Sequence, residues 1–163
     1  MDIKLIADKI KKLHEKNKIF LIAIDGRSGS GKSYVAKKLM EELPNSTLIQ
    51  VDSFDMYEGK TNVQKFIDTI LKPLRKDIEG DKIVILEGIF SLKSELISYY
   101  DFKIWVECPA EIGFKRGLKR DFELNGIDNS QKWINYWIPK EEEYIRKEEP
   151  QKKADYIIDG AAK

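Results

Sequence analysis

Short apolar runs alternate along the chain with amphipathic stretches. Residues 19–24 form the longest apolar run, Ile-Phe-Leu-Ile-Ala-Ile, which predicts a strand buried on both faces of a sheet. Shorter apolar runs predict further strands at residues 47–51, 82–86, 102–106 and 155–158. Because helical stretches separate these runs, the pattern predicts an α/β fold. Right-handed βαβ units would form a parallel sheet of about five strands, with helices on both faces.

The stretches between the apolar runs have the residue spacing of helices. Pro44 is expected to end the helix that begins at Lys32. Pro73 and Pro139 are expected to kink or interrupt two later helices, because proline lacks a backbone N–H and its ring clashes with the preceding turn. The predicted helices cover residues 3–16, 32–43, 62–79, 110–124 and 130–149.

Length and composition predict one soluble domain over residues 1–163. The formal net charge is +1, so no overall field points to nucleic acid or to an anionic membrane. The apolar run at 19–24 is too short to cross a bilayer, and the N-terminal residues lack the apolar segment of a signal peptide. Cys108 is the single cysteine, which is compatible with a reducing compartment. We therefore expect a cytoplasmic protein with a local anion site, while a homo-oligomer stays an open alternative to a monomer.

Residues 26–33 read Gly-Arg-Ser-Gly-Ser-Gly-Lys-Ser, the G-x-x-x-x-G-K-S pattern of a phosphate-binding loop, or P-loop. The segment follows a predicted strand and precedes a predicted helix, which is the context that the motif requires. The alternative is a glycine-rich turn that matches by accident, and the context argues against it. The residues expected to bind the nucleotide are Gly26, Arg27, Ser28, Gly29, Ser30, Gly31, Lys32, Ser33 and Tyr34.

Each residue type in the P-loop has a chemical role. Glycines permit positive φ angles and let the backbone approach phosphate, so that successive N–H groups form an anion nest at the start of a helix. Lys32 is expected to reach the β and γ phosphates of ATP, and the Ser33 hydroxyl is expected to bind Mg²⁺. The motif thus predicts a nucleoside triphosphate site, with ATP as the default. It does not say what happens to the γ-phosphate.

Three further segments, in order, resemble those of the uridine kinases and their phosphoribulokinase-like relatives. Residues 51–57 (Val-Asp-Ser-Phe-Asp-Met-Tyr) are similar to that family's Asp-Ser-Phe-Tyr segment, and residues 86–90 (Leu-Glu-Gly-Ile-Phe) to its Glu-Gly-Ile segment. Residues 116–121 (Arg-Gly-Leu-Lys-Arg-Asp) resemble its arginine-rich lid. Pro139 and residues 153–158 resemble the end of the family's sequences.

The resemblance covers about residues 4–160 and depends on the order and spacing of these segments. It implies a single-domain, three-layer P-loop NTPase fold with a helical lid at about residues 110–129. It also implies an ATP-dependent phosphotransferase with ATP and Mg²⁺ as cofactors. Such an enzyme would move the γ-phosphate to a hydroxyl group of a small molecule, for example the nucleoside uridine.

Two carboxylates that follow predicted strands are candidates for the chemistry. Asp52 would lie at the carboxyl edge of the sheet, where it could orient or accept the proton of the attacking hydroxyl, or bind Mg²⁺ through water. The alternative is that Asp52 caps a turn. Glu87 is either a Mg²⁺ ligand or an exposed carboxylate at a strand end. Asp25 also ends a strand and could instead anchor the loop.

Arg116 and Arg120 are four residues apart and therefore share one helix face. Two guanidinium groups on one face could clamp phosphate oxygens, and a helix closing over the nucleotide would exclude water. With Lys115 and Lys119 beside them, the alternative is a solvated basic face.

The departures from the family fall on the acceptor side. Only residues 58–84 separate the two family segments, where uridine kinases have a long insert that holds the nucleoside. The chain also has Gly-Ile-Asp at residues 126–128 where the family often has Gly-Arg-Asp. The identity of the acceptor therefore stays open. An NTP hydrolase and a non-catalytic nucleotide-binding protein stay as alternatives to a kinase.

Overall fold

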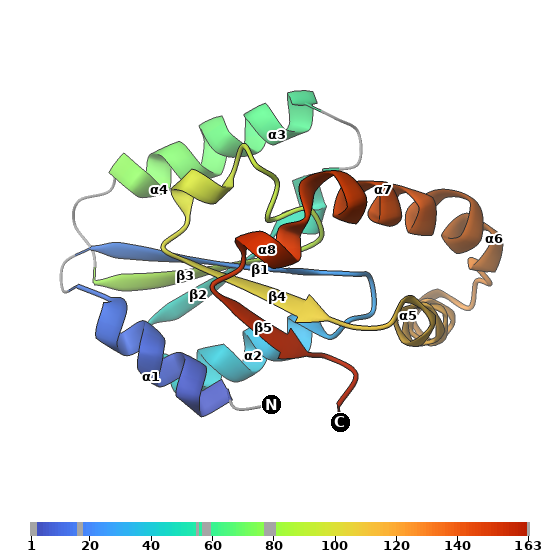
Figure 1. Ribbon diagram of the computed structural model, residues 1–163, viewed down its shortest axis with the longest axis horizontal. Helices are drawn as coiled ribbons and strands as arrows, with labels where there is room; N and C mark the ends of the chain where they lie inside the picture. Colours follow the sequence, from blue (N-terminus) through green and yellow to red (C-terminus); the bar gives the residue numbers. More distant parts are fainter. Residues whose placement is uncertain (1–2, 16–17, 55, 57–59, 77–80, 163) are drawn as a thin grey trace.

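A five-stranded parallel sheet forms the centre of the molecule in the order β2-β3-β1-β4-β5 (Figure 1). The computed structural model describes residues 3–15, 18–54, 56, 60–76 and 81–162. All five predicted strands are confirmed, with small shifts at their ends. The strands are β1 (Ile19–Gly26), β2 (Ser46–Gln50), β3 (Lys82–Glu87), β4 (Phe102–Glu107) and β5 (Tyr156–Asp159).

Helices occupy the predicted stretches, although the first ends earlier than expected, at Leu13. Residues 77–79 of the predicted third helix lie outside the described residues. No helix among the described residues is both long and apolar enough to span a membrane. The α-helices are α1 (Ile3–Leu13), α2 (Lys32–Glu42), α3 (Lys60–Phe66), α4 (Lys72–Lys76), α5 (Ala110–Asn125), α6 (Ser130–Lys132), α7 (Ile138–Glu148) and α8 (Pro150–Lys153).

Two prolines interrupt the α-helical pattern without ending the helix. A π-helical segment, η3 (Ile67–Leu71), precedes Pro73, and η5 (Trp133–Trp137) precedes Pro139. In each case the residue before proline donates its N–H five residues back instead of four. The extra residue in the turn moves the carbonyl with which the proline ring would clash. The expected interruptions are therefore present, as widened turns within continuous helices.

The strand β1 contributes side chains alternately to two cores, one on each face of the sheet. Phe20, Ile22 and Ile24 lie in the core that α1 and α2 cover. Leu21 and Ala23 lie in the opposite core, with side chains from α3, η3 and α7. Figure 1 shows α1 and α2 on one side of the sheet and α3, α4, α7 and α8 on the other. The predicted three-layer architecture is confirmed.

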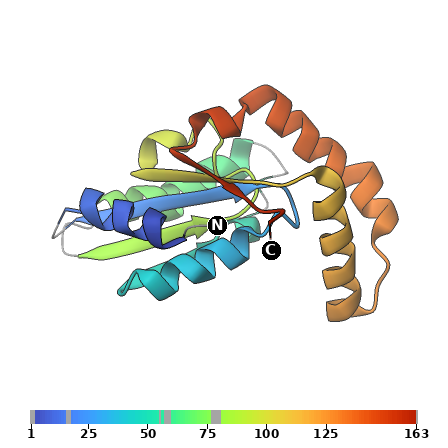
Figure 2. The ribbon, with the colours of Figure 1, turned by 60° about the horizontal axis from the view of Figure 1, so that its bottom comes forward.

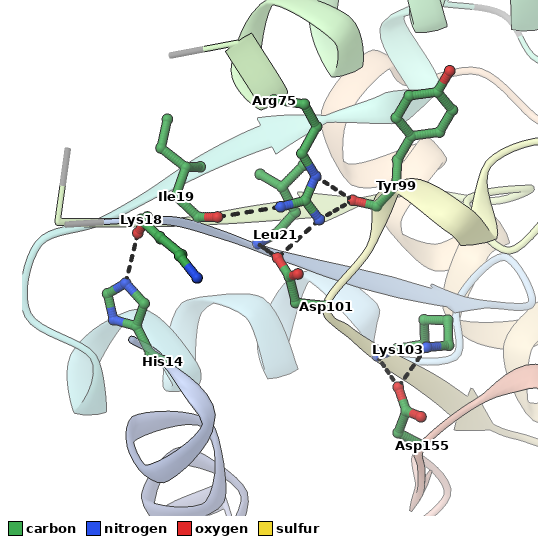
Figure 3. Close-up of polar contacts among 9 residues, drawn as sticks. All are labelled: His14, Lys18, Ile19, Leu21, Arg75, Tyr99, Asp101, Lys103 and Asp155. Carbon is green, nitrogen blue, oxygen red and sulfur yellow. Dashed lines mark hydrogen bonds and ion pairs between the residues drawn. The ribbon is translucent and has the colours of Figure 1, made fainter. Parts of the chain in front are cut away.

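The amino-terminal edge of the sheet is closed by polar contacts (Figure 3). The guanidinium of Arg75 donates hydrogen bonds to the carbonyl oxygens of Tyr99, at 2.9 Å, and Ile19, at 3.3 Å. It also pairs with Asp101, whose carboxylate accepts the N–H of Leu21 at 2.7 Å. These bonds tie α4 to the start of β1. The opposite, carboxyl edge is the end at which ligands bind in open α/β sheets.

Figure 2 shows α5 standing out from the carboxyl edge of the sheet, with the helical segment 130–148 running back from its far end. The two helices pack closely at Gly117, because a Cβ there would lie 2.3 Å from the ring of Trp133. Trp133 also donates its indole N–H to Asp121 at 2.8 Å. The segment predicted as a lid, residues 110–129, thus contains α5, and its movement stays a prediction.

Candidate active site

The P-loop joins the central strand β1 to α2 at the carboxyl edge of the sheet. Gly29 and Gly31 have φ angles of +71° and +101°, in the region that favours glycine. A Cβ on Gly29 would also lie 2.1 Å from the carbonyl oxygen of Gly113 in α5. Glycine at position 29 is therefore required both by its backbone conformation and by the close approach of α5.

Lys32 is buried and folds back over the P-loop. Its Nζ donates hydrogen bonds to the carbonyl oxygens of Gly26, at 3.0 Å, and Arg27, at 2.9 Å. Within the loop, the buried hydroxyl of Ser30 has no hydrogen-bond partner among the described residues. A buried ammonium and an unsatisfied hydroxyl beside the first turn of α2 fit the binding of an anion such as phosphate.

Ser33 and Glu87 present hard oxygen atoms at the same edge. The Ser33 hydroxyl donates to a carboxylate oxygen of Glu87 at 3.2 Å. Burial raises the pKa of Glu87, and the charge of Lys32 opposes this rise. No group of three acidic, histidine or cysteine side chains that could hold a metal lies among the described residues. The donor set fits Mg²⁺, which proteins hold with one or two side chains while substrate phosphates complete the shell.

Asp52 lies in η1 (Val51–Phe54), directly after β2, and is exposed. Its carboxylate accepts the N–H of Ile89 at 2.8 Å. Gly88 leaves room for this contact, because a Cβ there would lie 2.7 Å from the Asp52 oxygen. Asp52 therefore joins the loop after β3, near Glu87, whose pKa its charge helps to raise. This bond to the neighbouring loop differs from the turn cap considered as the alternative.

Arg116 and Arg120, the two arginines of α5 predicted to act together, contact different partners. Arg116 donates to the carbonyl oxygens of Gly160, at 2.7 Å, and Ala161, at 3.4 Å. Arg120 pairs with its neighbour Asp121 at 3.0 Å. The shared helix face thus does not place both guanidinium groups on one partner. The positive charge of Arg120 nevertheless acts on Glu87. It opposes the rise in the pKa of Glu87, although burial has the larger effect. A joint phosphate clamp stays a prediction.

A hollow of about 750 Å³ opens beside the P-loop. This volume is within the range of small-ligand sites, which is 300–1,000 Å³ as a rough guide. Tyr34, predicted to bind the nucleotide, lines the hollow and is 58% exposed. Sequence reasoning did not identify the contributions of Ile3, Lys38 and the C-terminal segment. The lining residues are Ile3, Ser30, Gly31, Tyr34, Lys38, Arg116, Gly160 and Ala162.

Asp25 anchors the start of the P-loop through buried hydrogen bonds. Its fully buried carboxylate accepts the N–H groups of Gly26, at 2.6 Å, and Leu92, at 2.8 Å, and the hydroxyl of Tyr144 at 2.6 Å. Burial raises the pKa of Asp25 to about 6, although these hydrogen bonds and the charge of Lys32 oppose the rise. The anchoring role considered for Asp25 fits this geometry.

Helix α7 supplies further contacts that sequence reasoning missed. Glu142 forms an ion pair with Arg27, and Glu141 accepts the N–H of Ser28 at 3.1 Å. The signal in the sequence is an acidic run at residues 141–143. Such a run is indistinguishable from a solvated helix face until the packing is known.

Known proteins resemble the chain in sequence and in fold. The sequence model described as "Phosphoribulokinase / Uridine kinase family" matches residues 55–162. The uridine kinase of Borrelia turicatae is 30% identical, over 85% of this chain and 85% of that enzyme. The uridine kinase of Brevibacillus brevis is 27% identical, over 85% of this chain and 83% of that enzyme. A solved structure of a possible uridine kinase from Bacillus stearothermophilus superposes with a TM-score of 0.74 at 20% identity, over 96% of this chain and 97% of that one.

The chain is shorter than its relatives in the matched region. The alignment with the Brevibacillus brevis enzyme is 181 positions long, more than the 163 residues of this chain. Gaps in this chain must therefore fill part of the alignment. The shortened acceptor region expected at residues 58–84 stays a prediction.

Proposed function

Because the chain belongs to the phosphoribulokinase and uridine kinase family, we propose that it is a small-molecule kinase using Mg²⁺-bound ATP. The reaction would transfer the γ-phosphate to a hydroxyl group of a small acceptor, for example a nucleoside. The observation that carries the proposal is the P-loop itself. Its glycines hold left-handed angles, its buried lysine donates to carbonyl oxygens of the loop, and its Ser33 contacts a strand-end carboxylate.

The P-loop amides and Lys32 would bind the phosphate chain. The N–H groups at the start of α2 lie where no earlier helical turn can accept their hydrogen bonds, so they are available to phosphate oxygens. Lys32 would place its ammonium on the β and γ phosphates and neutralise charge that develops during transfer. Ser33 and Glu87 would hold Mg²⁺, which supplies charge neutralisation on the phosphate oxygens when bound.

Asp52 would act on the acceptor. Its exposed carboxylate lies at the edge where the P-loop opens, and its bond to Ile89 fixes its direction. Phosphoryl transfer has a loose transition state, so orienting the hydroxyl matters more than strong basicity. We therefore assign Asp52 to hold the acceptor hydroxyl in line with the γ-phosphate and to receive its proton.

The hollow beside the P-loop would hold the base and ribose of the nucleotide. Its lining includes P-loop residues, Arg116 and the C-terminal segment, whose Gly160 accepts a hydrogen bond from Arg116. The exposed ring of Tyr34 offers a surface for stacking. Arg120, in the second half of α5, would neutralise phosphate charge after lid closure. The closed lid would exclude water from the reaction.

An assay of ADP release tests this function. Purified protein with Mg²⁺-ATP is incubated with a panel of nucleosides and other small alcohols, and products are identified by mass spectrometry. Acceptor-dependent ADP release with a phosphorylated product supports the kinase. ADP release that is independent of any acceptor would support an NTP hydrolase instead, and tight ATP binding without turnover across the panel would support a non-catalytic protein.

A further inference from the structure

One face of α7 contacts the first half of the P-loop and the residue before it. The carboxylate of Glu141 accepts the backbone N–H of Ser28 at 3.1 Å. One turn further along, the Tyr144 hydroxyl donates to Asp25 at 2.6 Å. Residues three apart on a helix share a face, so both contacts come from the same buried surface. Helix α7 thus contacts Asp25, directly before the loop, and Ser28, the third residue of the loop.

Glu141 is unusual among the acidic residues of this helix. It is 4% exposed, whereas the next two residues, Glu142 and Glu143, are exposed. Burying a carboxylate is costly unless hydrogen bonds compensate for its lost hydration. The backbone N–H of Ser28 supplies one such hydrogen bond to the Glu141 side chain. A glutamate at this position is therefore not explained as part of a solvated surface.

The contact falls next to Gly29, the residue of the P-loop that packs against α5. Gly29 has a positive φ angle and lies against the carbonyl group of Gly113, so α5 holds the chain after Ser28 while Glu141 holds the peptide N–H before it. In the observed form, the N–H of Ser28 donates to Glu141, and the N–H of Ser30 donates within the loop to the carbonyl oxygen of Arg27 at 3.0 Å. The amides at the start of α2 are then left for the phosphate chain. Loss of the Glu141 contact would allow other loop conformations, and nucleotide binding would have to reverse them.

We propose that Glu141 is a positioning residue of the phosphate site, which holds the Ser28 N–H and so keeps the P-loop in the form that accepts the triphosphate. The proposal rests on the proposed function, because it assumes that the loop binds a nucleotide. Glu141 acts through the loop and does not contact the substrate. A residue of this kind affects nucleotide affinity more than the chemical step.

Three variants separate this role from others. Glu141→Ala removes the acceptor, Glu141→Gln keeps an uncharged oxygen in place, and Glu143→Ala removes an exposed glutamate that pairs with Lys147 on the same helix. Calorimetry gives the Kd of Mg²⁺-ATP, kinetics give KM and kcat, and thermal unfolding gives Tm. We expect Glu141→Ala to raise Kd and KM for ATP about tenfold or more, with kcat within a few-fold. Glu141→Gln and Glu143→Ala should stay within about threefold of the wild type.

A residue that only supported the fold would lower Tm and the active fraction but leave KM unchanged. If Glu141→Ala does not fold, Glu141→Asp serves in its place, because its shorter side chain cannot reach Ser28 and should raise KM similarly. The proposal is overturned if the variant lacking the contact keeps the wild-type Kd and KM, or if Glu141→Gln is as impaired as Glu141→Ala. Failure of the wild type to bind Mg²⁺-ATP would instead refute the proposed function, and the positioning role with it.

Discussion

Alanine at Gly29 is the sharpest test of how the P-loop packs against α5. The φ angle of Gly29 is +71°, and a Cβ there would lie 2.1 Å from the main-chain oxygen of Gly113. The substitution therefore adds backbone strain and a clash with an atom that cannot rotate away. Left-handed strain costs about 1 kcal/mol and overpacking about 1–3 kcal/mol, so we expect the free energy of unfolding to fall by about 2–4 kcal/mol.

Two other glycines separate the two costs. Gly126 has φ +65° with nothing within 4 Å of a Cβ, so Gly126→Ala should show strain alone, about 1 kcal/mol. A Cβ on Gly113 would lie 2.5 Å from the carbonyl oxygen of Ser28. Gly113→Ala should therefore show the clash alone, offset by about 1 kcal/mol of helix propensity.

Urea denaturation of the three variants gives the free energy of unfolding, and titration with Mg²⁺-ATP gives the nucleotide affinity. If the loop must move away from α5, both Gly29→Ala and Gly113→Ala should bind ATP at least about tenfold more weakly, while Gly126→Ala should bind like the wild type. A Gly113→Ala protein with wild-type ATP affinity would refute the reasoning, because the loop geometry would then not depend on this contact.

The remaining predictions concern the charged groups of the site. Lys32→Ala should abolish nearly all turnover, because it removes the ammonium from the transferring phosphate; ADP release with the best acceptor measures this. Asp52→Asn should lower kcat far more than ATP affinity, whereas a loss of ATP binding alone would reassign Asp52 to the metal or the fold. Asp25 has a pKa raised to about 6, so the folded state binds more protons than the unfolded state between about pH 4 and 6. Stability should therefore fall as pH rises through this window and level off above it, by about 3 kcal/mol at most. Denaturation of Asp25→Asn across the same pH range should not show this fall in stability. If the variant and the wild type lose stability equally between about pH 4 and 6, Asp25 is not the source of the pH dependence.

The fold could be predicted because its main determinants are local. The apolar run at 19–24 has no polar face, which favours a strand inside a sheet covered on both sides, and every residue of β1 is buried. The P-loop was also recognisable because eight consecutive residues carry its whole geometry. The widened turns before Pro73 and Pro139 were not predictable, since apolar spacing does not register a single extra residue in a turn.

The parts of the site that depend on contacts between residues far apart in the sequence could not be predicted. The spacing of Arg116 and Arg120 correctly puts them on one helix, but Gly160 and Asp121 determine where their guanidinium groups point. Glu141 is separated by 113 residues from the amide that it binds. Its burial results from tertiary packing, which an acidic run in the sequence does not reveal.

The contacts of the P-loop restrict how the lid can close. Gly113, in the first turns of α5, lies against Gly29, and Trp133 packs onto α5 one turn further, at Gly117. Interiors packed this closely deform little, so the base of α5 cannot swing without moving the loop or the helix that begins at residue 130. Beyond Gly117, Asp121 accepts the indole N–H of Trp133 and pairs with Arg120, so the packing extends along α5. We therefore expect any closure to move α5 together with the helix that begins at residue 130. Arg116, bonded to the C-terminal segment, would then have to give up its bond to Gly160 for α5 to move.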